Sequence, residues 1–241
     1  MKAVVLAAGL GTRLGELTAE RSKPALLVGG HALIAHVVAH LDECGFEEVA
    51  VNLSYRPDQV RAALADARPA IRWFEESELL GTAGALSPMH DFLSGEEAFL
   101  VHYGDVLTDH DLGAMLTRHR ERDALLTMLI HERPGSNSVV AVDETGRVVA
   151  FLERPTDDER RGVASSWVNS GIYVCSAAVL ELLPRAPSDF ARDLVPRAMA
   201  AGAVFAEPLA GFRCAVDSPD RLGEAEAAFQ TGRWRSPLAS R

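Results

Sequence analysis

An unbroken apolar run near the start of the chain, Ala3–Ala8, ends at the glycine-rich sequence Gly9-Leu10-Gly11. A strand without polar positions is buried on both faces, which is typical of parallel sheets. Parallel neighbours need crossover connections, and helical patterns separate the further apolar runs in the first half of the sequence. The expected strands are 48–53, 70–74, 98–103 and 125–131, and the expected helices are 31–44, 57–64, 81–92 and 112–122. This alternation predicts an α/β fold with a doubly wound, mixed, mainly parallel sheet.

The second half of the sequence has a different pattern. Two alternating runs on either side of Asp143–Gly146 predict a hairpin over residues 139–151. Asp109 is expected to cap the helix at 112–122, and Ser218 the last helix. Further strands are expected at 165–174, 203–206 and 213–216, and further helices at 177–183, 190–201 and 218–229. We expect one domain over residues 1–229, followed by a frayed tail at 230–241.

The composition excludes several classes of partner. The chain has 241 residues, of which 48% are hydrophobic, so a sizeable core is possible, and its net charge is −10. An acidic chain is a poor match for nucleic acid or for anionic membranes, and no apolar run approaches the ~18 residues of a membrane span. The run Ala3–Ala8 is too short for a secretory signal core. Three scattered cysteines, Cys44, Cys175 and Cys214, are typical of reduced thiols in a cytoplasmic protein.

The glycine loop follows the first strand, at the sheet edge where open α/β folds bind their ligands. A dinucleotide-binding motif is disfavoured because Leu14 occupies the third glycine position, and a P-loop is disfavoured because no GK[ST] sequence follows. Arg13 and Lys23 change the interpretation of the loop. Arginine offers a planar fork for phosphate oxygens and lysine a point charge, and Pro24 restricts the backbone after Lys23. The loop therefore suits a triphosphate.

Six motifs in order carry a resemblance to a known family. They are LAAGLGTRL (6–14) with SKPAL (22–26), LGTAGAL (80–86), Gly104-Asp105, FLERP (151–155), VNSGIYV (168–174) and AVDSP (215–219). Together they resemble the sugar-1-phosphate nucleotidyltransferases, or NDP-sugar pyrophosphorylases, from residue 1 to about 229. The GTAG form is most similar to the guanylyltransferases for mannose 1-phosphate and related heptoses. The resemblance implies a Rossmann-like catalytic domain over residues 1–229, with a sugar-binding second half that contains the hairpin.

The resemblance also implies a role for individual residues. Asp105 and Asp217 would bind Mg²⁺, and together with Arg13 and Lys23 they form the expected catalytic set. Arg154 stands where the family has a lysine, and Leu79 stands where relatives have a glutamine that reads uracil or thymine. The expected nucleotide contacts are Leu6, Ala8, Gly9, Gly11, Thr12, Arg13, Lys23, Leu79, Gly81 and Thr82. The expected sugar-phosphate contacts are Gly104, Glu153, Arg154, Asn169 and Gly171.

The expected reaction transfers a nucleotidyl group from a nucleoside triphosphate, with GTP favoured, to a sugar 1-phosphate of mannose or heptose type. The products would be an NDP-sugar and pyrophosphate, formed by direct Mg²⁺-assisted in-line attack. The alternatives are a uridylyl- or thymidylyltransferase for another hexose 1-phosphate, a non-catalytic nucleotide-sugar-binding regulator, and a nicotinamide-dependent dehydrogenase. The chain ends too soon for the C-terminal β-helix of some relatives, so we expect a monomer or a homodimer formed through the catalytic domain. His36 and His40 have the spacing of a zinc pair on a helix, but a packed pair is favoured because no third ligand is evident.

Overall fold

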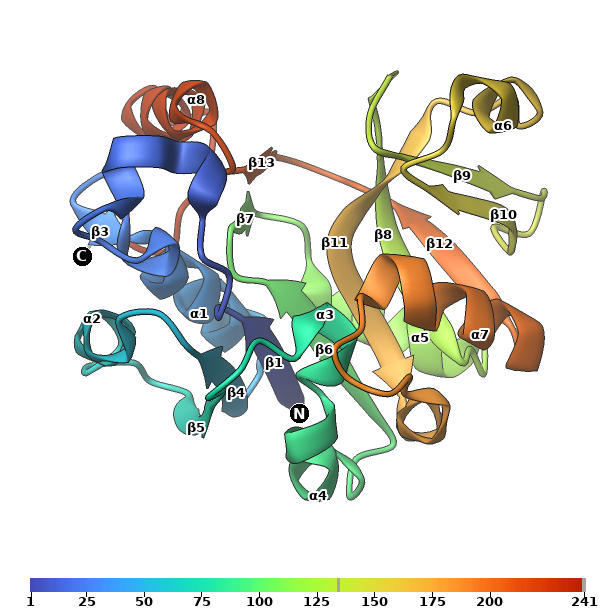
Figure 1. The fold of residues 1–241 in the computed structure, drawn as a ribbon, viewed down its shortest axis with the longest axis horizontal. Coiled ribbons are helices and arrows are strands. Elements are labelled where there is room, and N and C mark those ends of the chain that lie inside the picture. Colours follow the sequence, from blue (N-terminus) through green and yellow to red (C-terminus); the bar gives the residue numbers. More distant parts are fainter. Residues whose placement is uncertain (134, 240–241) are drawn as a thin grey trace. The chain divides into compact units, whose positions relative to one another are not determined.

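A seven-stranded mixed sheet organises the computed structural model, which describes residues 1–133 and 135–239 (Figure 1). The strand order is β12-β8-β11-β6-β1-β4-β5. Strand β1 pairs in parallel with β4, β4 with β5, and β12 with β8, whereas β11 runs antiparallel to β8. The mixed, mainly parallel α/β sheet predicted from the sequence is therefore confirmed.

The strands of this sheet lie close to the predicted ranges. They are β1 (Lys2–Leu6), β4 (Glu48–Leu53), β5 (Ala70–Glu75), β6 (Ala98–Tyr103), β8 (Leu126–Glu132), β11 (Trp167–Ser176) and β12 (Val204–Pro208). Three pairs of short strands lie outside it: β2 (Leu27–Val28) with β3 (His31–Ala32), β7 (Val106–Thr108) with β13 (Arg213–Ala215), and β9 (Ser138–Val142) with β10 (Val148–Glu153). The hairpin expected over 139–151 is the β9–β10 pair.

The α-helices divide into longer ones that match the predictions and short turns that do not. The longer helices are α1 (Leu33–Glu43), α2 (Pro57–Ala63), α5 (Leu112–Glu121), α7 (Val195–Ala201) and α8 (Pro219–Gln230). The region expected as one helix over 81–92 is divided into α3 (Gly81–Gly84), a 3-10 turn (Ser87–Met89) and α4 (His90–Leu93), and α6 covers Asp157–Arg161. Residues 177–182 form a 3-10 helix, and Phe190–Leu194 form a π-helical turn before α7. No helix among the described residues is long and apolar enough to cross a membrane.

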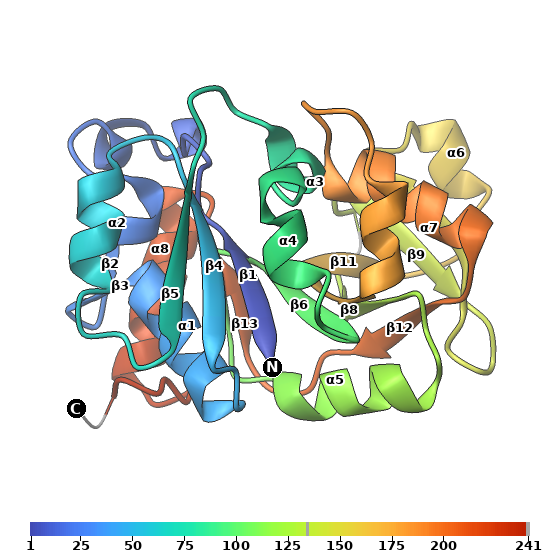
Figure 2. The same ribbon diagram turned by 90° about the horizontal axis from the view of Figure 1, so that it is seen from below.

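The chain divides into two compact units by its internal contacts. Unit 1 contains residues 1–79, 102–114 and 210–241, and unit 2 contains residues 80–101 and 115–209. In unit 1, β1 contributes the fully buried residues Ala3, Val4 and Val5, and helices α1 and α2 lie on the same side of β4 and β5 (Figure 2). In unit 2, β8 lies between β11 and β12. The single-domain description of residues 1–229 stays a prediction.

Two further local predictions are wrong. The cap of α5 is Asp111, whose Oδ1 accepts from the Ala114 amide at 2.8 Å, because Asp111 directly precedes the helix. Asp109 instead accepts from the Phe212 amide at 2.6 Å. The tail is also packed rather than frayed up to residue 239, since Trp234 is 2% exposed. Its indole stacks on Phe212, with ring centroids 5.6 Å apart.

Candidate functional site

The glycine loop of unit 1 wraps around the stem of Lys23. Gly11 has a φ of 67°, and a Cβ added there would lie 2.9 Å from the Lys23 Cβ. The Leu14 amide donates to the Gly11 carbonyl at 3.0 Å, and the Thr18 hydroxyl donates to the same carbonyl at 3.2 Å. Glycine is therefore needed at position 11 for both its conformation and its size, and the loop confines the lysine side chain.

Lys23 forms an ion pair with Asp105, another residue of the expected catalytic set. The Lys23 ammonium donates to Asp105 Oδ2, and the two side chains are 12% and 26% exposed. Gly104, directly before Asp105, donates its amide to the Leu6 carbonyl at 2.9 Å. A Cβ on Gly104 would lie only 2.9 Å from that carbonyl oxygen. The glycine therefore lets the turn after β6 approach β1 closely, which places Asp105 beside the glycine loop.

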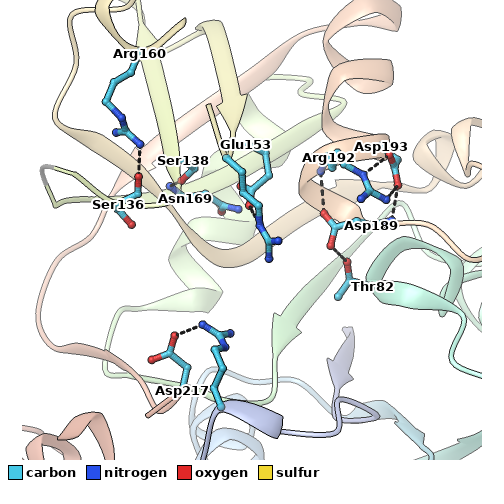
Figure 3. Close-up of polar contacts among 12 residues, drawn as sticks. Thr82, Ser136, Ser138, Glu153, Arg160, Asn169, Asp189, Arg192, Asp193 and Asp217 are labelled. Carbon is cyan, nitrogen blue, oxygen red and sulfur yellow. Dashed lines mark hydrogen bonds and ion pairs between the residues drawn. The ribbon is translucent and has the colours of Figure 1, made fainter. Parts of the chain in front are cut away.

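Asp217 reaches the same region from the far end of the chain. Strand β13 pairs antiparallel with β7, so that Ala215 lies opposite Val106. The Val216 amide then donates to the Asp105 carbonyl at 2.8 Å. Asp217 Oδ2 accepts from Arg13 Nη1 at 2.9 Å (Figure 3). The four residues expected to be catalytic thus form two ion pairs, joined by the short β7–β13 ribbon.

The donor set of these two pairs fits a divalent cation of the Mg²⁺ type. Mg²⁺ takes oxygen ligands and is usually held by one or two carboxylates together with substrate phosphates and water. Asp105 and Asp217 supply two carboxylates, and the described residues contain no group of three or more potential metal ligands. His36 and His40 are packed instead. His36 contacts the Ser236 hydroxyl at 2.7 Å, and His40 contacts the His110 carbonyl at 2.8 Å.

Sequence reasoning missed a buried polar chain beneath the glycine loop. Asn52, on β4, accepts from the Ala7 amide at 2.6 Å and donates to Glu76 at 2.7 Å. Asn52 is 4% exposed and Glu76 is 8% exposed. These bonds hold the end of β1 where the loop with Ala8, Gly9 and Thr12 begins. The available signal was an asparagine that follows the apolar residues Val49–Val51 within the strand.

The turn at Gly81 and Thr82 in unit 2 is held by residues that the sequence did not single out. Gly81 has a φ of 77°, and an added Cβ would lie 2.3 Å from the Ser188 carbonyl oxygen. The Thr82 hydroxyl donates to Asp189 Oδ2 at 3.0 Å and accepts from the Phe190 amide at 2.7 Å (Figure 3). Leu79, which directly precedes unit 2 in the sequence and belongs to unit 1, is 44% exposed. Asp189 is the main residue of this region that sequence reasoning missed.

Glu153 and Arg154 end the hairpin in different environments. The Glu153 side chain is 20% exposed, whereas that of Arg154 is 82% exposed, and the Arg154 Nε lies 3.8 Å from Glu153 Oε1. Burial, and next the negative charge of Asp189, raise the pKa of Glu153, while Arg154 partly opposes the rise. Arg154 has a φ of 52°, and its amide donates to the Asn137 carbonyl at 2.6 Å. The backbone therefore turns sharply at Arg154 and leaves its guanidinium in solvent.

Asn169 and Gly171 lie at an irregularity in β11. The register with β8 shifts between Asn169 and Tyr173, and Gly171 has a φ of 79°. The Asn169 side chain accepts from the Gly171 amide at 3.0 Å and donates to the Tyr173 hydroxyl. The asparagine therefore stabilises a bulge. Its expected contact with a sugar phosphate stays a prediction.

Comparisons with known proteins agree on one family. The family described as nucleotidyl transferase matches residues 2–213. Mannose-1-phosphate guanylyltransferase 1 of Arabidopsis thaliana is 31% identical over 229 residues, covering 91% of this chain and 62% of the relative. A UTP–glucose-1-phosphate uridylyltransferase of Synechocystis is 29% identical and covers 85% of this chain and 57% of the relative. The chain thus spans about three fifths of the length of these curated relatives.

One solved structure similar to this chain is that of HddC from Yersinia pseudotuberculosis in complex with GMP-PN. The two chains share 22% sequence identity with a TM-score of 0.79, covering 95% of this chain and 99% of HddC. At this level of identity the likeness concerns the fold. It agrees with the mixed α/β sheet described above.

Proposed function

Because the chain belongs to the nucleotidyl transferase family, we propose that it transfers a nucleotidyl group from a nucleoside triphosphate to a sugar 1-phosphate. The observation that carries the proposal is the pair of ion pairs in unit 1, Lys23 with Asp105 and Arg13 with Asp217. Two cations beside a glycine loop suit a triphosphate, and two carboxylates suit the metal that accompanies it.

GTP and a mannose- or heptose-type sugar 1-phosphate are the favoured substrates. The support is that relatives about 31% identical are named mannose-1-phosphate guanylyltransferases. A uridylyl- or thymidylyltransferase acting on another hexose 1-phosphate is the second candidate, because a UTP–glucose-1-phosphate uridylyltransferase is 29% identical. The retained carboxylates Asp105 and Asp217 argue against a non-catalytic regulator.

In the proposed reaction a phosphate oxygen of the sugar 1-phosphate attacks the α-phosphorus of the nucleotide. The new P–O bond forms as the bond to the β-phosphate oxygen breaks, and pyrophosphate leaves. The nucleophile is already anionic, so the reaction needs positioning and charge neutralisation rather than a general base. Lys23 would neutralise the phosphates near the reacting centre, Arg13 the departing pyrophosphate, and Arg154 the sugar phosphate.

Members of the family generally use a divalent metal ion. In this chain Asp105 and Asp217 would hold it, and we infer that the ion is Mg²⁺. Such an ion, when bound, supplies positive charge to the phosphate oxygens. Lys23 and Arg13, which now pair with these two aspartates, would then be available to the nucleotide phosphates. Glu153 would accept hydrogen bonds from sugar hydroxyls.

The cellular location, the partners and the assembly of the enzyme are also inferred. Cys44, Cys175 and Cys214 are free thiols, which supports a reducing, cytoplasmic location. The acidic net charge argues against nucleic acid as a partner. A monomer or a homodimer through the catalytic domain is our inference for the assembly.

The decisive experiment measures pyrophosphate release with Mg²⁺ for each common nucleoside triphosphate against mannose 1-phosphate and glucose 1-phosphate. We expect release with GTP and mannose 1-phosphate, and its loss in Asp105→Asn. Release with UTP or dTTP instead would favour the second candidate. Absence of release with every pair, in a protein that still binds nucleotide by thermal shift, would favour a binding protein or a heptose substrate. Heptose 1-phosphate as acceptor separates those two.

A further inference from the structure

The turn Leu80–Gly84 of unit 2 depends on the segment Ser188–Phe190 for its shape. The Ser188 carbonyl accepts from the Ala83 amide at 2.9 Å and from the Gly84 amide at 3.3 Å, and the Ser188 amide donates to the Leu80 carbonyl at 2.9 Å. A helix of four residues has too few internal hydrogen bonds to be stable alone. The segment at 188–190 therefore fixes the turn.

Asp189 is the side chain in that segment with the most fixed geometry. Its Oδ2 accepts from the Thr82 hydroxyl at 3.0 Å, and its Oδ1 accepts from the Arg192 amide at 2.8 Å. Its own amide donates to Asp193 Oδ2 at 2.7 Å. A carboxylate held by donors on both oxygens is well oriented, and bonds to an ionised acceptor are stronger than neutral ones. Figure 3 shows this set of contacts around Asp189.

The same carboxylate acts on Glu153 at the end of β10. Strand β10 packs against the π-helical turn that Asp189 caps, which brings the two carboxylates into one region. Burial raises the pKa of Glu153, and the negative charge of Asp189 raises it further. Arg154 opposes the effect from 3.8 Å but is 82% exposed and therefore screened. The Asp189 charge is thus the main charged neighbour that destabilises ionised Glu153.

Other charged groups on the elements packed against β10 are bonded elsewhere. Arg192 pairs with Asp193 at 2.9 Å, and both follow Asp189 on the π-helical turn. Arg197 of α7 donates to the Leu182 carbonyl at 3.4 Å, and Glu207 of β12 accepts from Arg118 at 2.9 Å. Strand β9 carries no charged side chain. Asp189 is therefore the group whose removal changes the electrostatics of Glu153 most directly.

We propose that Asp189 is a positioning residue that fixes the turn at Gly81–Thr82 through the Thr82 hydroxyl and places a second negative charge beside Glu153. The inference rests on the proposed function, in which Thr82 contacts the nucleotide and Glu153 the sugar. One carboxylate then links both substrates, since the orientation of the nucleotide turn and the ionisation of the sugar-binding glutamate depend on it.

Asp189→Asn tests both effects, because asparagine keeps the shape and removes the charge. The KM for GTP should rise about tenfold, as expected when a hydrogen bond to a charged acceptor becomes a neutral one. The acidic limb of kcat/KM for mannose 1-phosphate should move to lower pH, because the Glu153 carboxyl is then ionised more easily. The phosphate of the substrate also titrates, but identically for both enzymes, so the difference between the two profiles isolates the protein group.

Two variants separate the effects. Thr82→Val should raise the KM for GTP and leave the acidic limb in place, since it removes the hydroxyl and keeps the charge. Asp193→Asn is the matched control, because Asp193 lies four residues further along the same turn and its charge is paired with Arg192. It should leave the acidic limb unchanged. An unshifted limb in Asp189→Asn, or an equal shift in Asp193→Asn, would overturn the proposal.

A measurement without catalysis distinguishes failure of the proposal from failure of the proposed function. The ¹³C-carboxyl resonance of Glu153, assigned with Glu153→Gln, is titrated in the wild type and in Asp189→Asn. The pKa of Glu153 should be lower in the variant. An unchanged value contradicts the link between Asp189 and Glu153 whether or not the chain releases pyrophosphate. If the pKa of Glu153 is lowered in the variant but the protein releases no pyrophosphate, the electrostatic link between Asp189 and Glu153 is supported and the assignment of substrates is overturned.

Discussion

At the scale of single residues, Lys23 stands out because the chain has only one other lysine, Lys2. The remaining basic side chains are arginines, including Arg154 where the family resemblance would place a lysine. The close contact with Gly11 explains why position 23 differs. A guanidinium is a planar, branched group, whereas an ammonium is a compact point charge on a slender stem. The loop accommodates the slender stem.

Replacing Lys23 should therefore be costly even when the charge is kept. We expect Lys23→Ala to lower kcat by about 10²–10³-fold, by analogy with the loss of an oxyanion donor. Lys23→Arg should restore only a small part of this loss, because the fork cannot occupy the position of the ammonium. Steady-state pyrophosphate release measures both variants, and Lys2→Arg is the matched control. A Lys23→Ala enzyme within a few-fold of the wild type would contradict the assignment.

At the scale of secondary-structure elements, the start of α8 determines the direction of the chain beside Asp217. Ser218 is the N-cap, and its hydroxyl accepts from the Arg221 amide at 3.3 Å, as the sequence predicted. Pro219 at the first helical position and Asp220 in the first turn support the same start. The cap thus fixes both the helix and the residue directly before it.

Ser218→Ala should lower the free energy of unfolding by about 1 kcal/mol, because the Arg221 amide in the first turn of α8 loses its hydrogen-bond acceptor. Urea unfolding of the two proteins measures this loss. Ser218→Asn, which preserves a capping acceptor, should recover most of it. If alanine and asparagine destabilise equally, the capping bond is not the reason, and the residue acts through packing instead.

At the scale of the whole molecule, buried histidines make stability depend on pH. Burial lowers the pKa of His36, His102 and His119 to about 4, whereas the neighbouring Cys44 raises that of His40. A histidine with a lowered pKa in the folded state binds protons more weakly than in the unfolded chain. Its contribution is therefore complete above the unfolded pKa and is lost as pH falls from there toward the folded pKa.

The free energy of unfolding should thus decrease between about pH 7 and about pH 5, by up to about 2 kcal/mol for each of the three histidines. Urea unfolding at a series of pH values measures the slope. His119→Gln, which can still bond to the Thr127 hydroxyl, should reduce the slope. His90→Gln replaces an exposed histidine and should leave it unchanged. If the free energy of unfolding does not change with pH, these histidines bind protons as readily in the folded protein as in the unfolded chain.

The order of strands and helices followed from the sequence because it depends on local signals. Apolar runs of strand length, helical spacing and turn residues repeat within a few positions, and the hairpin at β9–β10 and the cap at Ser218 were found in this way. The errors lay at short elements, such as the turns within 81–92, and at the cap of α5. Asp109 and Asp111 are both residues of the capping type, and the expected helix already began at residue 112, so that Asp111, directly before it, was the cap to expect.

The partners of the candidate site were decided by tertiary structure. Arg13 and Asp217 are 204 positions apart, and Thr82 and Asp189 are 107 positions apart. The first pair was expected in one site through the family motifs, whereas the second was not expected at all. A sequence determines which segments become strands and helices, because neighbouring residues share those conformations. Which distant side chains meet depends on strand order and register, and these arise only when the whole core packs.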